Sequence, residues 1–251
     1  MNITQTFYDN LASQYDKLFL DWQSATREQA VLLNKIFQDH GFHTTAQLLD
    51  CACGIGTQAI GLARLGYNVT ASDLSSGALA EAKTRAASAN VTLRLENADF
   101  CALSSTFPEQ FDIVIAMDNA LPHMLTAEAL GRAVKSIAGR MKENGLFVGS
   151  IRDYDDLLQE KPPYSPPYIH KTENGQRVAF QTWEWEEDRY TLTQYIIDDD
   201  SQLAVSKFTC QYRATTREEL TKLFLSCGCR KVTWHFPEET GFYQPIIVVR
   251  K

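Results

Sequence analysis

The 251-residue sequence lacks several features that mark nucleic-acid-binding, membrane or exported proteins. It contains no run of Lys and Arg longer than two and carries a net charge of −7, whereas nucleic-acid binding requires a concentrated basic surface. No apolar stretch approaches the roughly 20 residues of a membrane span. The opening segment MNITQTFYDNLASQYD does not have the basic and then apolar layout of a secretory signal. We therefore expect a cytoplasmic protein that binds neither nucleic acid nor membranes.

The six cysteines do not have the spacing of a typical structural zinc site. Cys51 and Cys53 form one Cys-x-Cys pair and Cys227 and Cys229 another, whereas zinc-binding pairs usually enclose two or more residues. The other two cysteines stand alone. We expect all six to be small, reduced and mostly buried residues, and we expect no metal ion.

Residues 46–151 alternate between short apolar runs and helical patterns. Strands alternating with helices of this length predict a parallel sheet that helices cover on both faces. The expected strands are 46–51, 67–73, 91–99, 111–118 and 145–151, and the expected helices are 57–66, 76–89 and 126–141.

The flanking segments have other patterns. Residues 7–19 and 26–41 show helical periodicity. The segment EKPPYSPPY holds four of the eight prolines and predicts a semi-rigid loop. Three strand-like stretches then predict an antiparallel meander at 177–186, 190–197 and 203–213, followed by a helix at 215–228 and strands at 231–236 and 243–251.

The segment LLDCACGIGTQAIGLARLGYNVTASDLS has the pattern of a nucleoside-binding turn. Gly54 and Gly56 let the backbone bend sharply and let a ligand approach it closely. The next helix starts near Thr57, so its free N–H groups point at the turn. Asp73 ends the following strand, where a carboxylate can bind ribose hydroxyls or merely cap the helix after it.

Two classes of nucleoside-binding fold fit this segment. Residues 54–59, GIGTQA, match the Gly-x-Gly-x-x-Ala fingerprint of nicotinamide-dependent dehydrogenases. Three features favour a different ligand. Asp50 precedes the turn, at a position where dinucleotide-binding folds usually have an apolar residue. The segment NADF ends a strand with an acid and an aromatic residue, which together can hold an adenine. We also expect no second domain after the sheet.

Four motifs, taken in order, resemble those of class I S-adenosylmethionine-dependent methyltransferases: the segment from Leu48 to Ser75, LENADF, FDIVIAMDNALPHM and ENGLFVGSIRDYDDLL. NALPH, RDYD, the meander and FYQPIIVVRK are most similar to the glycine and sarcosine N-methyltransferases. The chain departs from the glycine enzyme's Asn-Trp at Asp99 and Phe100, and its N-terminal arm is shorter. The resemblance implies an α/β, doubly wound, Rossmann-like fold. Its sheet has seven mostly parallel strands, with the last strand antiparallel and a β meander inserted after strand five.

The same resemblance divides the chain into four parts. It implies that residues 1–45 cover the cofactor site, that residues 46–151 form the cofactor-binding core, and that residues 152–214 form the substrate side. Residues 215–251 would then complete the core sheet.

The resemblance also implies roles for individual residues. Those implied to bind the cofactor, S-adenosylmethionine, are Arg27, Asp50, Cys51, Ala52, Gly54, Gly56, Asp73, Leu74, Asp99, Phe100, Met117 and Asn119. Those implied to bind the substrate are Arg152, which matches an arginine that grips the substrate carboxylate, Tyr154 and Tyr212. The catalytic candidates are His123, Tyr15 and Tyr243.

The activity implied is direct in-line transfer of a methyl group to a small amine, such as a glycine-like amino acid. An oxygen or carbon acceptor, a dehydrogenase and a non-enzymatic cofactor-binding protein remain alternatives. Asp118 and Asn119 could contribute to a magnesium site, but the sequence offers no convincing ligand set. Arg152 could instead pair with Asp153 on the surface, and Asp99 could be an exposed strand end. The sequence indicates no oligomeric state.

Overall fold

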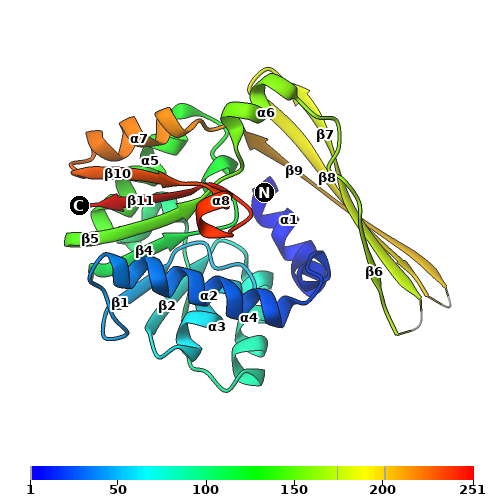
Figure 1. Cartoon of the computed structure of the whole chain (residues 1–251), viewed down its shortest axis with the longest axis horizontal. Coiled ribbons are helices and arrows are strands. Elements are labelled where there is room, and N and C mark those ends of the chain that lie inside the picture. Colours follow the sequence, from blue (N-terminus) through cyan, green and yellow to red (C-terminus); the bar gives the residue numbers. More distant parts are fainter. Residues whose placement is uncertain (1, 174, 201) are drawn as a thin grey trace.

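The computed structural model describes residues 2–173, 175–200 and 202–251, and its centre is a seven-stranded sheet (Figure 1). Neighbouring strands are parallel except where β11 is one of the pair, which confirms the predicted doubly wound fold with an antiparallel last strand. The spatial order is β10 (Lys231–His235), β11 (Ile246–Arg250), β5 (Met141–Ser150), β4 (Phe111–Ala116), β1 (Gln47–Asp50), β2 (Asn68–Asp73) and β3 (Arg94–Asn97).

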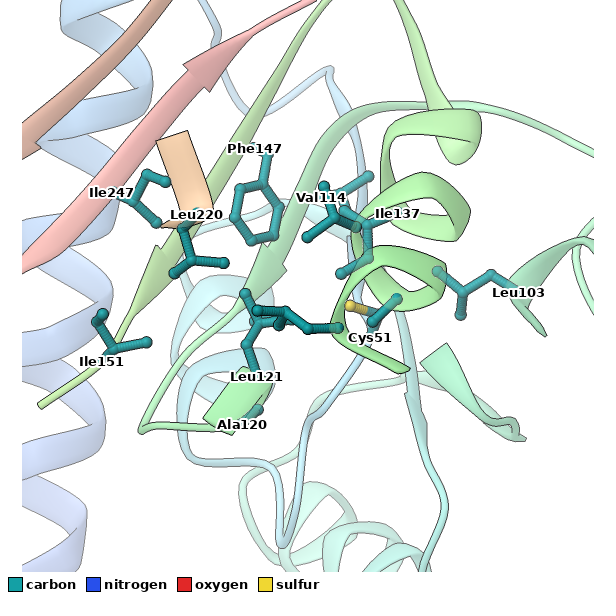
Figure 2. Close-up of a cluster of buried hydrophobic side chains, with 14 of the residues drawn as sticks. Cys51, Leu103, Val114, Ala120, Leu121, Ile137, Phe147, Ile151, Leu220 and Ile247 are labelled. Atoms are coloured by element: carbon teal, nitrogen blue, oxygen red, sulfur yellow. The ribbon is translucent and has the colours of Figure 1, made fainter. Parts of the chain in front are cut away.

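Helices bury both faces of this sheet. Leu48 packs in a cluster with residues of α2 (Trp22–Asp39) and α3 (Thr57–Arg64). Its neighbour Leu49 packs on the other side with residues of α5 (Ala127–Arg140) and α7 (Arg217–Ser226). Figure 2 shows part of this second cluster, with Val114, Phe147 and Ile247 of three strands beside Ile137 and Leu220 of the two helices. The strands are therefore apolar on both faces, as their near-continuous hydrophobic runs predict.

The N-terminal segment lies between the core and the second sheet (Figure 1). It consists of α1 (Ile3–Leu11) and the 3₁₀ helix η1 (Ala12–Leu18), and it approaches α4 (Ser76–Ser88) closely. Asp9 on α1 accepts hydrogen bonds from the Ser75 hydroxyl at 2.6 Å and from the Gly77 backbone N–H at 2.9 Å. A Cβ on Gly77 would lie only 3.0 Å from the Cα of Asp9, so a side chain here would push α1 outward by a few tenths of an ångström.

The segment after β5 forms a separate antiparallel sheet, which projects away from the core (Figure 1). Its strands are β6 (Tyr168–Lys171), β7 (Gln176–Glu186), β8 (Arg189–Asp199) and β9 (Leu203–Arg213), in that order. The meander predicted from the sequence is present, but β6 adds a fourth strand to it. The proline-rich segment runs along β7, where the backbone N–H of Trp183 donates to the Pro163 carbonyl at 2.8 Å.

The fold also contains four short elements that we did not predict from the sequence. They are η2 (Phe100–Ser105), η3 (Leu121–His123), α6 (Tyr154–Glu160) and α8 (Pro237–Thr240). Two of them, η3 and α6, follow the carboxyl ends of β4 and β5, where the sheet opens. Across the described residues, no helix combines the length and the apolar character needed to cross a membrane.

Candidate active site

The glycine turn after β1 forms the floor of a cavity of about 720 Å³. Gly54 has φ +51°, and a Cβ added to it would meet no atom within 4 Å, so this residue leaves the space beside the turn free. Gly56 has φ +91° and starts α3, and a Cβ there would collide with Ile60 at 2.9 Å. Both positions need the left-handed conformation that glycine adopts without strain. Gly54 therefore faces the cavity, whereas Gly56 lies outside the cavity wall and shapes the turn beside Ile60.

Asp73 connects the turn to the next helix. Its Oδ2 accepts the Gly54 N–H at 2.8 Å and its Oδ1 accepts the Ser75 N–H at 2.9 Å. The cap of α4 is the Ser75 hydroxyl, which accepts from the Ala78 N–H. Because each carboxylate oxygen has two lone pairs, Asp73 can still accept bonds from a ligand in the cavity.

Asp50 lies beneath the turn and is not part of the cavity wall. The side chain is 1% exposed, and its Oδ1 accepts the Ala52 N–H at 3.3 Å while its Oδ2 has no partner. Burial raises the pKa of Asp50 from 3.8 to about 8; the Ala52 bond opposes this shift and the charges of Asp73 and Asp118 add to it. In the cofactor-free protein, Asp50 is therefore a largely protonated residue that supports the turn from beneath.

Asp99 and Phe100 form another wall of the cavity. Asp99 is exposed, and its Oδ1 accepts the Cys101 N–H at 2.8 Å at the start of η2. Its Oδ2 is available to a ligand, beside the half-buried ring of Phe100. This pairing of an acceptor with an aromatic face suits an adenine.

A hydrogen-bonded group of polar residues follows β4. Asn119 accepts the Arg152 N–H at 3.1 Å and bonds to the Tyr154 hydroxyl at 2.9 Å. The hydroxyl of Tyr8, on α1, lies 2.9 Å from Nε2 of His123. Burial lowers the pKa of His123 to about 3, with Gln211 opposing and Arg152 adding to this shift, so the imidazole is neutral.

A second cavity, of about 1020 Å³, opens between the core and the antiparallel sheet. Arg152 lines it and lies over the Trp183 ring at 4.9 Å from its centroid. The guanidinium donates to the Tyr190 hydroxyl and, at 2.9 Å, to Gln181 Oε1. In the part of the chain that the structure describes, Arg152 forms no ion pair with a carboxylate. Two of its five donors are used, so the others can bind an anion in the cavity.

The two cavities share three lining residues: Tyr8, Tyr15 and Asp118. These three side chains therefore lie at the boundary between the two cavities. Sequence analysis missed Tyr8, and it considered Asp118 only as a magnesium ligand.

The structure gathers most of the predicted site residues in these two places. Cys51, Ala52, Gly54, Asp73, Leu74, Asp99, Phe100, Met117 and His123 line the first cavity. Asn119, Arg152, Tyr212 and Tyr243 line the second, and Tyr15 lines both. Tyr154 is fully buried behind the second cavity.

Arg27 is a correction to the predicted set. It is exposed on α2, donates to the Ser24 hydroxyl at 2.8 Å and lies in the wall of neither cavity. The helical face that points inward carries Thr26 and Ala30 instead, because α2 packs this face against Gly61 of α3.

Among residues 2–173, 175–200 and 202–251, no three His, Cys, Asp or Glu side chains are grouped so that they could hold a metal ion. The first cavity fits S-adenosylmethionine instead. It offers an open approach over Gly54, a carboxylate with free lone pairs at Asp73 and an acid beside an aromatic ring at Asp99 and Phe100.

Comparisons with known proteins agree with this fit. Residues 48–145 match a family described as a methyltransferase domain. A glycine/sarcosine N-methyltransferase of Parasynechococcus marenigrum (strain WH8102) is 27% identical over 155 residues, which are 62% of this chain and 54% of that protein. One from Aphanothece halophytica is 21% identical over 238 residues, 95% of this chain and 85% of that protein. The chain thus spans about half of the first relative and most of the second.

The fold is also similar to that of solved methyltransferases. An S-adenosylmethionine-dependent methyltransferase from Clostridium acetobutylicum superposes with a TM-score of 0.76 at 19% identity, covering 97% of this chain and 98% of that one. The glycine turn, the strand order and the matched domain lead to one conclusion. Residues 48–145 form a methyltransferase domain, and the fold of the chain is similar to that of an S-adenosylmethionine-dependent methyltransferase.

Proposed function

We propose that this methyltransferase methylates the nitrogen of a small amine that also carries a carboxylate, such as a glycine-like amino acid. The observation that carries the proposal is Arg152, whose guanidinium faces the second cavity without an ion pair to a described carboxylate. Arginine binds carboxylates through two parallel N–H bonds. The names of the two relatives, glycine/sarcosine N-methyltransferases, support the same acceptor class.

In this proposal, residues 46–151 hold the cofactor and residues 152–214 hold the acceptor. Residues 1–45 cover the boundary between the two cavities, and residues 215–251 complete the core sheet. When bound, the sulfonium cofactor supplies an activated methyl group. The protein's task is alignment, which can contribute about 7–11 kcal/mol. Tyr8 and Tyr15 line the wall where the two ligands meet, and Tyr243 lies in the wall of the second cavity. Their hydroxyls can stabilise positive charge at this junction.

We further infer that the enzyme acts on a free small molecule in the cytoplasm, and not on nucleic acid or at a membrane. The acidic composition, with a net charge of −7, supports this. So does a cavity of about 1020 Å³, which matches a small ligand.

The experiment is a screen of small amines, hydroxy acids and uncharged amines with labelled S-adenosylmethionine. We expect the label to appear on the nitrogen of carboxylate-bearing amines. Transfer of the labelled methyl group to an oxygen or a carbon would show that the acceptor is not an amine. Cofactor binding without transfer to any compound would favour a non-enzymatic role.

A further inference from the structure

Asp118 is the one carboxylate among the residues that line both cavities. It lies two residues after the end of β4, and both Asp118 (φ +55°) and Asn119 (φ +68°) adopt the left-handed conformation. Two consecutive non-glycine residues of this kind are uncommon and are held only by strong local contacts. Here the Asp118 N–H donates to the Ser150 hydroxyl at 2.8 Å, and the Asn119 N–H donates to the Ser150 carbonyl at 3.1 Å. The backbone therefore fixes where the Asp118 side chain points.

Neutral groups then fix the carboxylate itself. Its Oδ1 accepts the Tyr243 hydroxyl at 2.7 Å, and its Oδ2 accepts Nε2 of the buried Gln58 at 2.8 Å. Gln58 is held in turn by Gln29 at 2.7 Å. Neither donor carries a charge, and Asp118 forms no ion pair with a described Lys, Arg or His. The carboxylate is thus held in place but has no cation, and each oxygen keeps a free lone pair.

The second cavity presents the Arg152 guanidinium and several carboxylates to a ligand. Glu28, Asp156 and Glu160 are exposed to solvent and Asp153 pairs with Arg217, whereas Asp118 lies where the wall of this cavity adjoins the first one.

Burial raises the pKa of both Tyr15 and Tyr243, and the charge of Asp118 raises both further while that of Arg152 lowers both. Both tyrosines line the cavity wall that contains Asp118 and Arg152, and the Tyr243 hydroxyl donates to Asp118. A carboxylate at the cofactor side of a cavity and a guanidinium elsewhere in its wall complement the ammonium and the carboxylate of an amino acid.

A bound ammonium must lose its proton before its nitrogen can attack a methyl group. His123 is poorly suited to accept it, because burial lowers the pKa of His123 to about 3. Burial shifts Asp118 in the helpful direction and raises its pKa, although the bonds from Tyr243 and Gln58 oppose this. Asp118 is therefore a stronger base than an ordinary carboxylate.

We propose that Asp118 is a catalytic residue that binds the ammonium group of the acceptor and removes its proton. This inference rests on the proposed function. An N–H bond of the ammonium breaks and an O–H bond forms on Asp118. The nitrogen lone pair then forms the new C–N bond while the C–S bond of the sulfonium breaks, with its electron pair passing to sulfur.

The test compares Asp118→Asn with Asp39→Asn, because Asp39 is an exposed carboxylate on α2 that lies in the wall of neither cavity. Asparagine tolerates a positive φ, so the backbone should be kept. Calorimetry on protein saturated with S-adenosylhomocysteine measures binding of glycine and of its hydroxy acid, glycolate. We expect wild type and Asp39→Asn to favour glycine over glycolate by about tenfold or more, and Asp118→Asn to lose most of this preference. In turnover of the accepted amine, kcat should fall about 100-fold or more in Asp118→Asn only.

Three outcomes would contradict the inference. In one, Asp118→Asn keeps the wild-type preference for the amine and its kcat. In another, the Asp118→Asn substitution weakens the binding of S-adenosylmethionine much more than the binding of S-adenosylhomocysteine, which would place the carboxylate against the sulfonium. A wild-type protein that methylates no amine would overturn the proposed function and this inference with it. Should the asparagine variant fail to fold, Asp118→Gly removes the carboxylate at a backbone conformation that glycine accepts, and the same criteria apply.

Discussion

Asp73 has two tasks at the residue scale, because it holds the glycine turn and also faces the first cavity. We expect Asp73→Asn to weaken S-adenosylmethionine and S-adenosylhomocysteine by about tenfold or more, since a hydrogen bond to a charged group contributes roughly 1.5–3 kcal/mol. Calorimetric titration measures the loss, with the exposed Asp39→Asn as a charge-matched control. Unchanged affinity in a folded Asp73→Asn protein would mean that the carboxylate only shapes the turn.

Arg152 lines the second cavity but not the first, so its replacement should separate acceptor binding from cofactor binding. Lysine keeps the charge but cannot reproduce the planar fork. We predict that Arg152→Lys raises KM for a carboxylate-bearing amine and lowers kcat/KM about tenfold or more, while cofactor affinity stays near the wild-type value. Steady-state kinetics test this, with the exposed Arg189→Lys as control. Wild-type kinetics in Arg152→Lys would remove the basis for the glycine-like acceptor.

Asp50 should make the stability of the cofactor-free protein depend on pH. Its pKa is raised to about 8 by burial, so the folded protein keeps a proton that the unfolded chain loses near pH 4. Between these values the folded state binds more protons, and the free energy of unfolding must fall as pH rises, by up to about 1.4 kcal/mol per pH unit.

The measurement is urea unfolding at pH 5, 6.5 and 8. We expect the wild type to lose stability over this range relative to Asp50→Asn, which cannot titrate, whereas Asp39→Asn should follow the wild type. Parallel curves for the wild type and Asp50→Asn would show that Asp50 is ionised in the folded protein. The nearby charges of Asp73 and Asp118 are present in all three proteins and cancel in the comparison.

Residue types and spacing in the sequence located the first cavity better than the second. The glycine turn and Asp73 are local in the chain, so the residues beside them could be named without a structure. Tyr8 could not, because helical periodicity selects Phe7 and Leu11 as the buried face and does not distinguish core from cavity. The meeting of Asp118 with Tyr243 joins residues 125 positions apart, and no local pattern reports such a contact.

At the scale of elements, the contact between α1 and α4 closes the first cavity, since Asn2 to Gln5 and Tyr8 form part of its wall. A side chain at Gly77 would push against the Asp9 backbone, and overpacking of this kind costs about 1–3 kcal/mol. We predict that Gly77→Val increases hydrogen exchange in residues 3–11 and weakens cofactor binding. Gly139→Val on α5 is the matched control, because a Cβ there meets nothing within 4 Å. Equal exchange in both variants would show that α1 does not depend on this contact.

The elements that sequence patterns predicted are those with a strong apolar period. Each strand of the large sheet and each long helix was expected within a few residues of its observed bounds. The missed elements give little such signal. Tyr168–Lys171 forms β6 at an exposed sheet edge, with only His170 buried, and α6 is a single short acidic helix. Both depend on packing against distant parts of the chain.

At the scale of the whole molecule, the mostly parallel core sheet and the projecting antiparallel sheet contribute to two adjoining cavities. Tyr8, Tyr15 and Asp118 line both of them. Core residues such as Gly54, Asp73 and Asp99 line the first cavity, and the inserted sheet supplies Trp183 and Tyr212 beside Arg152. The inserted segment forms much of the wall of the second cavity.

The most direct test of this account is the mass of the products formed from matched acceptors with isotopically labelled S-adenosylmethionine. Glycine and other small amino acids would each be compared with the amide that lacks the carboxylate and with the hydroxy acid that lacks the amine. The account predicts labelled methyl on the nitrogen of at least one amino acid, with kcat/KM about tenfold or more above its amide and no product from its hydroxy acid. Equal turnover of the amino acid and its amide, or methylation of the hydroxy acid alone, would contradict it.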